Sequence, residues 1–112
     1  MSKRYTPDVG DIIHVHFELP QRQSDQDFKP ALVISPATYN KKSGLVVCCA
    51  ITKEPSGYPF EVPLRAHDGQ AVLADQVKSL GWPDIKISHH GRAAPEELAA
   101  VRAMLSALLL PG

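Results

Sequence analysis

No stretch of the 112-residue sequence is apolar over the length that a membrane-spanning helix needs. Its start, MSKRYTPDVGD, is charged, and no hydrophobic segment of signal-peptide length follows it. We therefore expect a cytoplasmic protein without a membrane anchor. The chain is also too short for two hydrophobic cores, so we expect a single domain over residues 1–112.

The sequence has no excess of either charge, since 12 Lys and Arg balance 12 Asp and Glu. Proteins that coat duplex DNA usually carry a basic excess, so this class of function is disfavoured. A balanced charge is still compatible with a small, local site for an anion.

Cysteine is scarce, and the two cysteines, Cys48 and Cys49, are neighbours in an apolar run. Adjacent residues of a strand point to opposite faces, so these two thiols are badly placed to bridge each other. We interpret them as small buried hydrophobic residues rather than a redox pair.

Most of the chain has the pattern of short strands. GDIIHVHF alternates with a period of two, whereas ALVIS (31–35) and LVVCCAI (45–51) are continuous apolar runs typical of strands covered on both faces. PATYNKKSG, between these two runs, has room for a short helical turn or loop only. PFEVPL (59–64) predicts an edge strand because of its internal proline, QAVLADQVKSL (70–80) one or two strands, and IKIS (85–88) a further strand.

Only the end of the chain predicts a helix. In PEELAAVRAMLSALLL, an apolar stripe repeats at a spacing of three to four residues: Leu98, Val101, Leu105 and Leu108. Pro95 suits the first helical position, and Glu96 and Glu97 lie favourably at the positive end of the helix dipole. Many short strands followed by one helix indicate a mainly β (α+β) fold, a bent sheet or partly open barrel with a C-terminal helix.

Several segments together resemble one family. GDI, KPALVISP, YNKKSG, ITKEPSGYPFEV, LADQVKSLGW and APEEL, in this order, resemble the MazF/PemK toxins from about residue 5 to the terminal helix. The resemblance implies an SH3-like barrel of the MazF/CcdB type. It also implies a homodimeric toxin of a type II toxin–antitoxin system, inhibited by an acidic, MazE-like antitoxin. The implied activity is sequence-specific cleavage of single-stranded mRNA, without metal or cofactor, to 2′,3′-cyclic phosphate and 5′-hydroxyl ends.

Two alternatives remain at this stage. One is a non-catalytic SH3-like binding module, which a small neutral barrel could serve. The other is a gyrase poison like CcdB, although the chain ends in LLLPG and not in the Trp-Gly-Ile tail that this function needs.

The resemblance assigns the chemistry to Lys29 and Thr52. The family usually has an arginine where Lys29 precedes Pro30, and it has a threonine at the position of Thr52. Metal-free cleavage needs acid–base groups and a positive charge near the pentacoordinate phosphate. We expect Lys29 to supply both and Thr52 to hold the phosphate. Lysine lacks the planar fork of arginine, but it gives up its proton more readily when it is desolvated.

Other polar residues are weaker candidates for RNA binding. In the loop ELPQRQSDQDF (18–28), Asp25 and Gln26 are the nearest counterparts of the residues in the family's RNA-closing loop, and Arg22 is a candidate for an added phosphate contact. Gln76 and Lys78, two residues apart in ADQVKS, are expected on one strand face and by resemblance contact phosphate or bases.

The histidines offer two further hypotheses. His14 and His16 share a strand face and are candidates for an acid–base helper role beside Lys29. Their spacing also suits zinc, with His89 and His90 as added ligands, but the sequence has no recognisable metal motif, so we predict no metal site.

Overall fold

The computed structural model describes residues 5–16, 28–67 and 69–111. In chain order the elements are β1 (Asp11–His16), β2 (Phe28–Val33), α1 (Ala37–Ser43), β3 (Val46–Thr52), β4 (Glu61–Pro63), β5 (Ala71–Leu80), the 3₁₀ turn η1 (Trp82–Asp84), β6 (Lys86–Arg92) and α2 (Pro95–Leu109).

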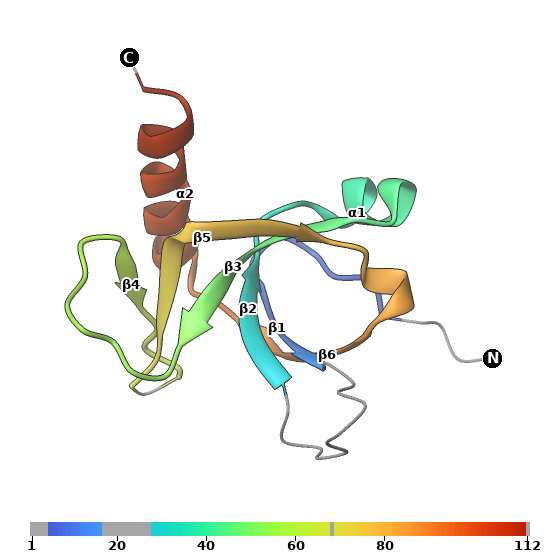
Figure 1. The fold of residues 1–112 in the computed structure, drawn as a ribbon, viewed down its shortest axis with the longest axis horizontal. Coiled ribbons are helices and arrows are strands. Elements are labelled where there is room, and N and C mark those ends of the chain that lie inside the picture. Colours follow the sequence, from blue (N-terminus) through green and yellow to red (C-terminus); the bar gives the residue numbers. More distant parts are fainter. Residues whose placement is uncertain (1–4, 17–27, 68, 112) are drawn as a thin grey trace.

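The six strands form one antiparallel sheet in the order β4-β5-β3-β2-β1-β6. The sheet is strongly bent, with α2 over one end and α1 at the other (Figure 1). Its two edge strands, β4 and β6, are not paired with each other, so the sheet is not closed. The predicted α+β architecture with an open barrel and a C-terminal helix is confirmed.

Two segments have a structure that their sequence did not predict in full. Residues 37–43, expected as no more than a turn, form the helix α1, which ends where Gly44 adopts a left-handed conformation with φ of 73°. Residues 71–80 form a single strand with an irregularity: Cys49 pairs with Val77, whereas Ile51 pairs with Val72. Residues 73–76 of β5 therefore lie opposite a single residue of β3, and β5 bends sharply there (Figure 1).

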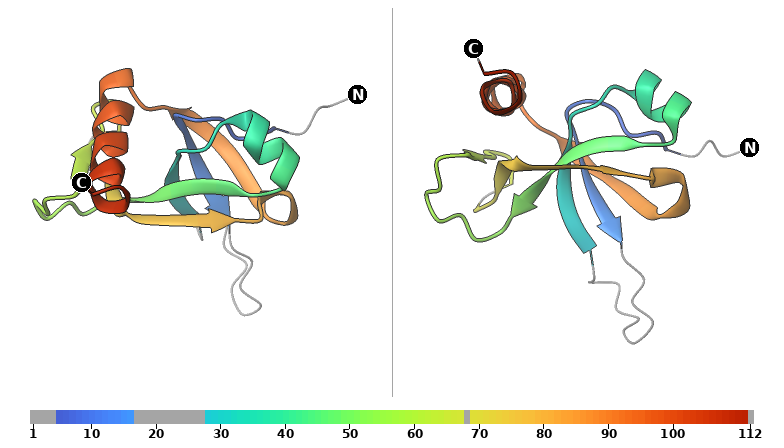
Figure 2. Two further views of the ribbon diagram at one scale, coloured as in Figure 1. Left: turned by 90° about the horizontal axis from the view of Figure 1, so that it is seen from above. Right: turned by 45° about the horizontal axis from the view of Figure 1, so that its top comes forward.

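The two faces of the sheet bury separate cores. On the face that we call outer, β1, β2, β3, β4 and β5 pack against α2 through Val101 and Leu105. On the other, inner face, the bent sheet folds around a second cluster: Ile13, Val15, Ala31, Val33, Val46, Cys48 and Trp82. Figure 2 shows α2 on one side of the sheet, away from the enclosed inner side. The helix thus covers the outer face of the barrel.

The stripe of α2 is therefore mostly internal. Val101 is fully buried and Leu105 nearly so, whereas Leu108, Leu109 and Leu110 remain 41, 64 and 76% exposed. Glu97 joins the start of α2 to the loop after β4, because its carboxylate accepts hydrogen bonds from the backbone N–H groups of Ala94 (2.8 Å) and Arg65 (2.7 Å).

A buried carboxylate ties the N-terminal segment to β6. Asp11, 3% exposed, accepts hydrogen bonds from the Tyr5 hydroxyl (2.5 Å), the Asp8 N–H (3.0 Å) and the Arg92 guanidinium (2.7 Å). Both cysteines are buried free thiols, as predicted. Burial raises the pKa of Cys48 to about 11 and that of Cys49 to about 12, so neither thiol is reactive at neutral pH.

Candidate active site

Lys29 and Thr52 both face the inner side of the sheet. Lys29 pairs with Val15, whose side chain lies in the inner core, and directly opposite residues of an antiparallel pair share a face. Ala31 pairs with Ala50, and Lys29 and Thr52 each lie two residues beyond this pair, so their side chains are on that same face. The two residues to which the resemblance assigned the chemistry therefore share one face of the sheet.

The strands that carry these residues separate at this point. The recorded β2–β3 pairs end at Ala31 and Ala50, and the start of β2 and the end of β3 then diverge (Figure 1). Lys29 is exposed on β2, and Thr52 is half-buried at the end of β3. The Thr52 hydroxyl oxygen accepts a hydrogen bond from the Glu54 N–H at 3.1 Å, which fixes the turn that leaves β3.

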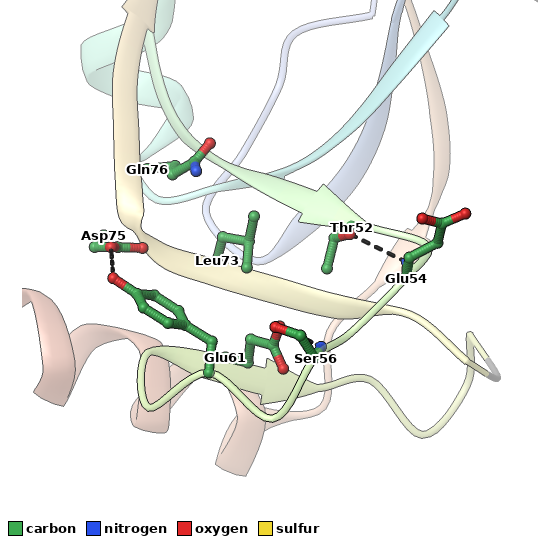
Figure 3. A pocket seen from close by; sticks show the side chains of 8 residues that line it. Thr52, Glu54, Ser56, Glu61, Leu73, Asp75 and Gln76 are labelled. Carbon is green, nitrogen blue, oxygen red and sulfur yellow. Dashed lines mark hydrogen bonds between the residues drawn. The ribbon is translucent and has the colours of Figure 1, made fainter.

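Beside Thr52 lies a pocket of about 280 Å³ between β3, the β3–β4 loop, β4 and the bend of β5. Figure 3 shows the side chains that line it: Thr52, Glu54, Ser56, Tyr58, Glu61, Leu73, Asp75 and Gln76. Three of them are carboxylates, and one is an aromatic ring. The pocket therefore presents mainly hydrogen-bond acceptors and one flat apolar surface.

Internal hydrogen bonds hold two of these carboxylates in place. Glu61 accepts from the backbone N–H groups of Ser56 and Gly57, both at 3.0 Å, and so shapes the β3–β4 loop. The Tyr58 hydroxyl donates to Oδ2 of Asp75 at 2.6 Å, and this bond raises the pKa of Tyr58. The other oxygen of Asp75, Oδ1, is buried and has no hydrogen-bond partner among the described residues.

Gln76 and Lys78 join the same side of the sheet. Lys78 pairs with Cys48, an inner-core residue, and Gln76 lines the pocket beside Thr52. The predicted common face of these two residues is thus present in the structure. Their charge and amide groups extend the candidate site along β5.

His14 and His16 lie on the opposite side of the sheet. His16 pairs with Phe28 and His14 with Pro30, one residue out of step with the Val15–Lys29 pair. Their rings therefore project from the outer face, and the sheet separates them from Lys29. Asp25 and Arg22 fall outside the described residues. Within residues 5–16, 28–67 and 69–111, no three His, Cys, Asp or Glu side chains come together as metal ligands.

A family model described as PemK-like, MazF-like toxin of type II toxin–antitoxin system matches residues 8–109. The chain belongs to this family. Among relatives, an Escherichia coli (strain K12) protein named endoribonuclease toxin MazF is 41% identical over 97% of this chain and 99% of its own.

Solved structures of the same kind superpose closely on this MazF-like chain. A MazE–MazF complex from Deinococcus radiodurans matches with 41% identity and a TM-score of 0.82, covering 94% of this chain and 97% of that one. A structure of MazF from the same organism matches with 42% identity and a TM-score of 0.80, covering 95% and 98%. Neither the binding module nor the gyrase poison receives support from these relatives.

Sequence reasoning on this MazF-like chain left the acceptor groups of the pocket without a role. Tyr58 and Glu61 occur in GYPFEV, and Asp75 occurs in LADQVKS, motifs that carried the resemblance. The carboxylates within these motifs were the available signal. No helix in the described part of the chain is long and apolar enough to span a membrane.

Proposed function

We propose that this toxin is an endoribonuclease that cleaves single-stranded RNA by attack of the neighbouring 2′-hydroxyl, without a metal ion. The observation that carries the proposal is the placement of Lys29 and Thr52 on one sheet face, beside a pocket, in a chain of the MazF-like family. The products are a 2′,3′-cyclic phosphate and a 5′-hydroxyl, and the enzyme acts in the cytoplasm.

Lys29 supplies the positive charge and the proton transfer. As the 2′-hydroxyl gives its proton to solvent and its oxygen bonds to phosphorus, negative charge grows on the phosphoryl oxygens, and the ammonium group lowers the energy of that state. The bond from phosphorus to the 5′-oxygen then breaks, that oxygen takes a proton from the ammonium group, and the resulting amine regains a proton from solvent. The Thr52 hydroxyl contacts the phosphate and orients it for in-line attack.

The pocket beside Thr52 receives a base of the substrate. Single-stranded RNA is recognised through bases that are splayed out, stacked on flat side chains and hydrogen-bonded at their edges. Tyr58 offers the flat surface, while Asp75 and Glu61 offer acceptors for the amino and imino N–H groups of a base edge. Carboxylates would repel a phosphate, so the pocket fits a base and Lys29 fits the backbone.

The partners are a second copy of the chain and an acidic antitoxin. Relatives have been solved as MazE–MazF complexes, which supports an antitoxin here. For the homodimer, most of the leucine stripe of α2 is already used within the protomer. An apolar groove of about 390 Å³ remains, lined by Ile34, Val47, Val77, Arg102, Leu105, Ser106, Leu109 and Leu110. This groove and the exposed end of α2 are the apolar surfaces left for the contact.

The test is incubation of purified protein with a long single-stranded RNA in EDTA, followed by mapping of both new ends. Cleavage should persist in EDTA, and Lys29→Ala should lower the rate by roughly 10²–10⁴-fold with almost no change in melting temperature, because the side chain is exposed. Lys41→Ala removes an exposed lysine from α1 and serves as the matched control.

Lys29→Arg separates charge from proton transfer. If charge alone matters, the arginine variant keeps most of the activity. If lysine releases its proton during turnover, the variant loses activity and the pH–rate profile shifts. Activity that vanishes in EDTA and returns with Mg²⁺, or a Lys29→Ala enzyme as fast as the parent, overturns the proposed mechanism.

A further inference from the structure

The outer face carries a stack of side chains that crosses β6, β1 and β2 and reaches the residue after β3, behind Lys29 and Thr52. The His14 ring lies parallel to the Phe28 ring, with 4.1 Å between centroids and 10° between planes. On its other side it stacks on His90, at 3.5 Å and 12°. The Lys53 ammonium lies 4.8 Å from the centroid of Phe28. We call these four residues, with His16 and Ser88, the histidine face.

A hydrogen-bonded chain runs beside this stack. Nε2 of His16 lies 3.2 Å from Oγ of Ser88, and the same oxygen lies 3.0 Å from Nε2 of His90. A hydroxyl has one proton to donate and two lone pairs that accept. With both rings neutral, Ser88 donates to one ring and accepts the N–H of the other, so its proton is used within the chain.

The charged groups around the histidine face are cationic. Burial, together with the charges of His90, His16, Lys53 and His67, lowers the pKa of His14 to about 4. Lys86 pairs with His16 and therefore stands on the same side of the sheet. The polar groups around the histidine rings are thus Lys53 after β3, His67 after β4, and Lys86 and Ser88 from β6. A chain with no net charge has gathered positive charge here.

The stack also decides where an added proton resides. Two imidazolium rings 3.5 Å apart would repel each other strongly, so His14 and His90 do not both ionise. His14 remains neutral, since its pKa is the depressed one, and it acts as a flat platform. An added proton therefore resides on one of the other two rings of the face, His16 or His90.

The position of the face indicates what it binds. Phe28 directly precedes Lys29, and Lys53 directly follows Thr52. The Phe28–Lys53 end of the stack is therefore next in sequence to both residues of the proposed catalytic pair. An RNA strand that leaves Lys29 and Thr52 across the ends of β2 and β3 meets Lys53 and Phe28 first. His14, His16 and His90 then follow across β1 and β6.

We propose that the histidine face binds a backbone phosphate of the single-stranded RNA that extends beyond the cleavage site, and that it binds this phosphate more tightly at acidic pH. This inference rests on the proposed ribonuclease function for the identity of the ligand. It adds a second RNA subsite on the other side of the sheet from Lys29.

Protonation prepares this subsite. When both His16 and His90 carry a proton on Nε2, both rings donate to Ser88, whose two lone pairs accept them. The hydroxyl proton of Ser88 is then released from the chain and can point to a phosphate oxygen. The charge of the added proton attracts the same phosphate, and the Lys53 and Lys86 ammonium groups add to the attraction.

The experiment measures binding of a fluorescent 2′-O-methyl oligonucleotide, which has no free 2′-hydroxyl and cannot be cleaved. Anisotropy titrations at pH 5.5 and pH 8.0 should show roughly tenfold tighter binding at the lower pH, the scale of one charge-assisted hydrogen bond. The slope of log affinity against log salt should steepen by about 0.7 for each phosphate gained. His90→Gln and Ser88→Ala should each remove most of this pH dependence.

His89→Gln is the matched control. His89 is next to His90 on β6 but pairs with Ile13 of the inner core, so its side chain projects from the inner face, opposite the histidine face. This variant should keep the full pH dependence, and circular dichroism should show that all variants remain folded. Equal affinity of the parent at both pH values, or an unchanged pH dependence in His90→Gln, overturns the proposal. Loss of cleavage of natural RNA would instead overturn the proposed function and leave this binding result intact.

Discussion

Replacement of Asp11 by Asn tests the buried hydrogen bonds that connect the N-terminal segment to β6. Asp11 is 3% exposed and accepts from the Tyr5 hydroxyl at 2.5 Å and the Arg92 guanidinium at 2.7 Å. Asparagine has nearly the same size but only one acceptor oxygen and no charge. An NH2 group then replaces the acceptor at one of the two oxygen positions, so either the Arg92 N–H, or the Tyr5 hydroxyl and the Asp8 N–H, can no longer donate there. The ion pair with Arg92 is lost in any case.

The magnitude follows from the burial of each group. Losing one partner of a buried ion pair costs about 3–5 kcal/mol, and a single hydrogen bond to a charged group about 1.5–3 kcal/mol. The Arg92 side chain is 57% exposed, so water solvates its charge once Asp11 is gone. We therefore expect the free energy of unfolding to fall by about 2–3 kcal/mol, near the lower of these ranges.

The assay is urea unfolding followed by circular dichroism at one fixed protein concentration, because the proposed dimerisation would make the midpoint depend on concentration. Asp84→Asn, the same change at an exposed position in η1, is the control and should alter stability by less than about 0.5 kcal/mol. The reasoning is wrong if Asp11→Asn is as stable as this control. A double-mutant cycle with Arg92→Gln should show a coupling energy, since the two side chains share one bond.

Three further outcomes follow from the same structure. Burial and neighbouring cations lower the pKa of His14 to about 4, so the neutral ring is favoured in the folded state. Its contribution to stability is complete above pH 6.5 and is lost as the pH falls toward 4. Over this pH range, the free energy of unfolding measured in urea should fall less in His14→Gln than in the parent, by on the order of 1 kcal/mol after solvent screening. Burial and the Asp11 hydrogen bond raise the pKa of Tyr5, so its contribution is present below pH 10 and is lost above it; alkaline unfolding curves of Tyr5→Phe should show a smaller loss. Tyr58→Phe removes the 2.6 Å bond that orients Asp75, and steady-state cleavage of a short RNA should show a roughly threefold to tenfold higher KM, whereas an unchanged KM would exclude Asp75 from base recognition.

The sequence by itself determined the elements and the family of this protein. Period-two patterns and apolar runs identified the strands, because alternation along a strand is a local property of the backbone. Pro63 marked β4 as an edge strand, and the stripe at three-to-four spacing marked α2 as a helix. The ordered motifs pointed to the MazF-like family and, within it, to Lys29 and Thr52. All of these signals lie within short segments, so no contact between distant residues was needed to read them.

Tertiary structure alone decided which residues share a face. Alternation tells which side chains of one strand point together, but the pairing register decides how one strand's faces align with its neighbour's. The Val15–Lys29 pair sets Lys29 on the inner face and sends His14 to the outer face, so the expected helper histidines stand behind the site. His14 meets His90 across 76 positions of sequence only because β1 pairs with β6. The bend in β5 likewise carries Asp75 to Tyr58, because residues 73–76 lie opposite a single residue of β3.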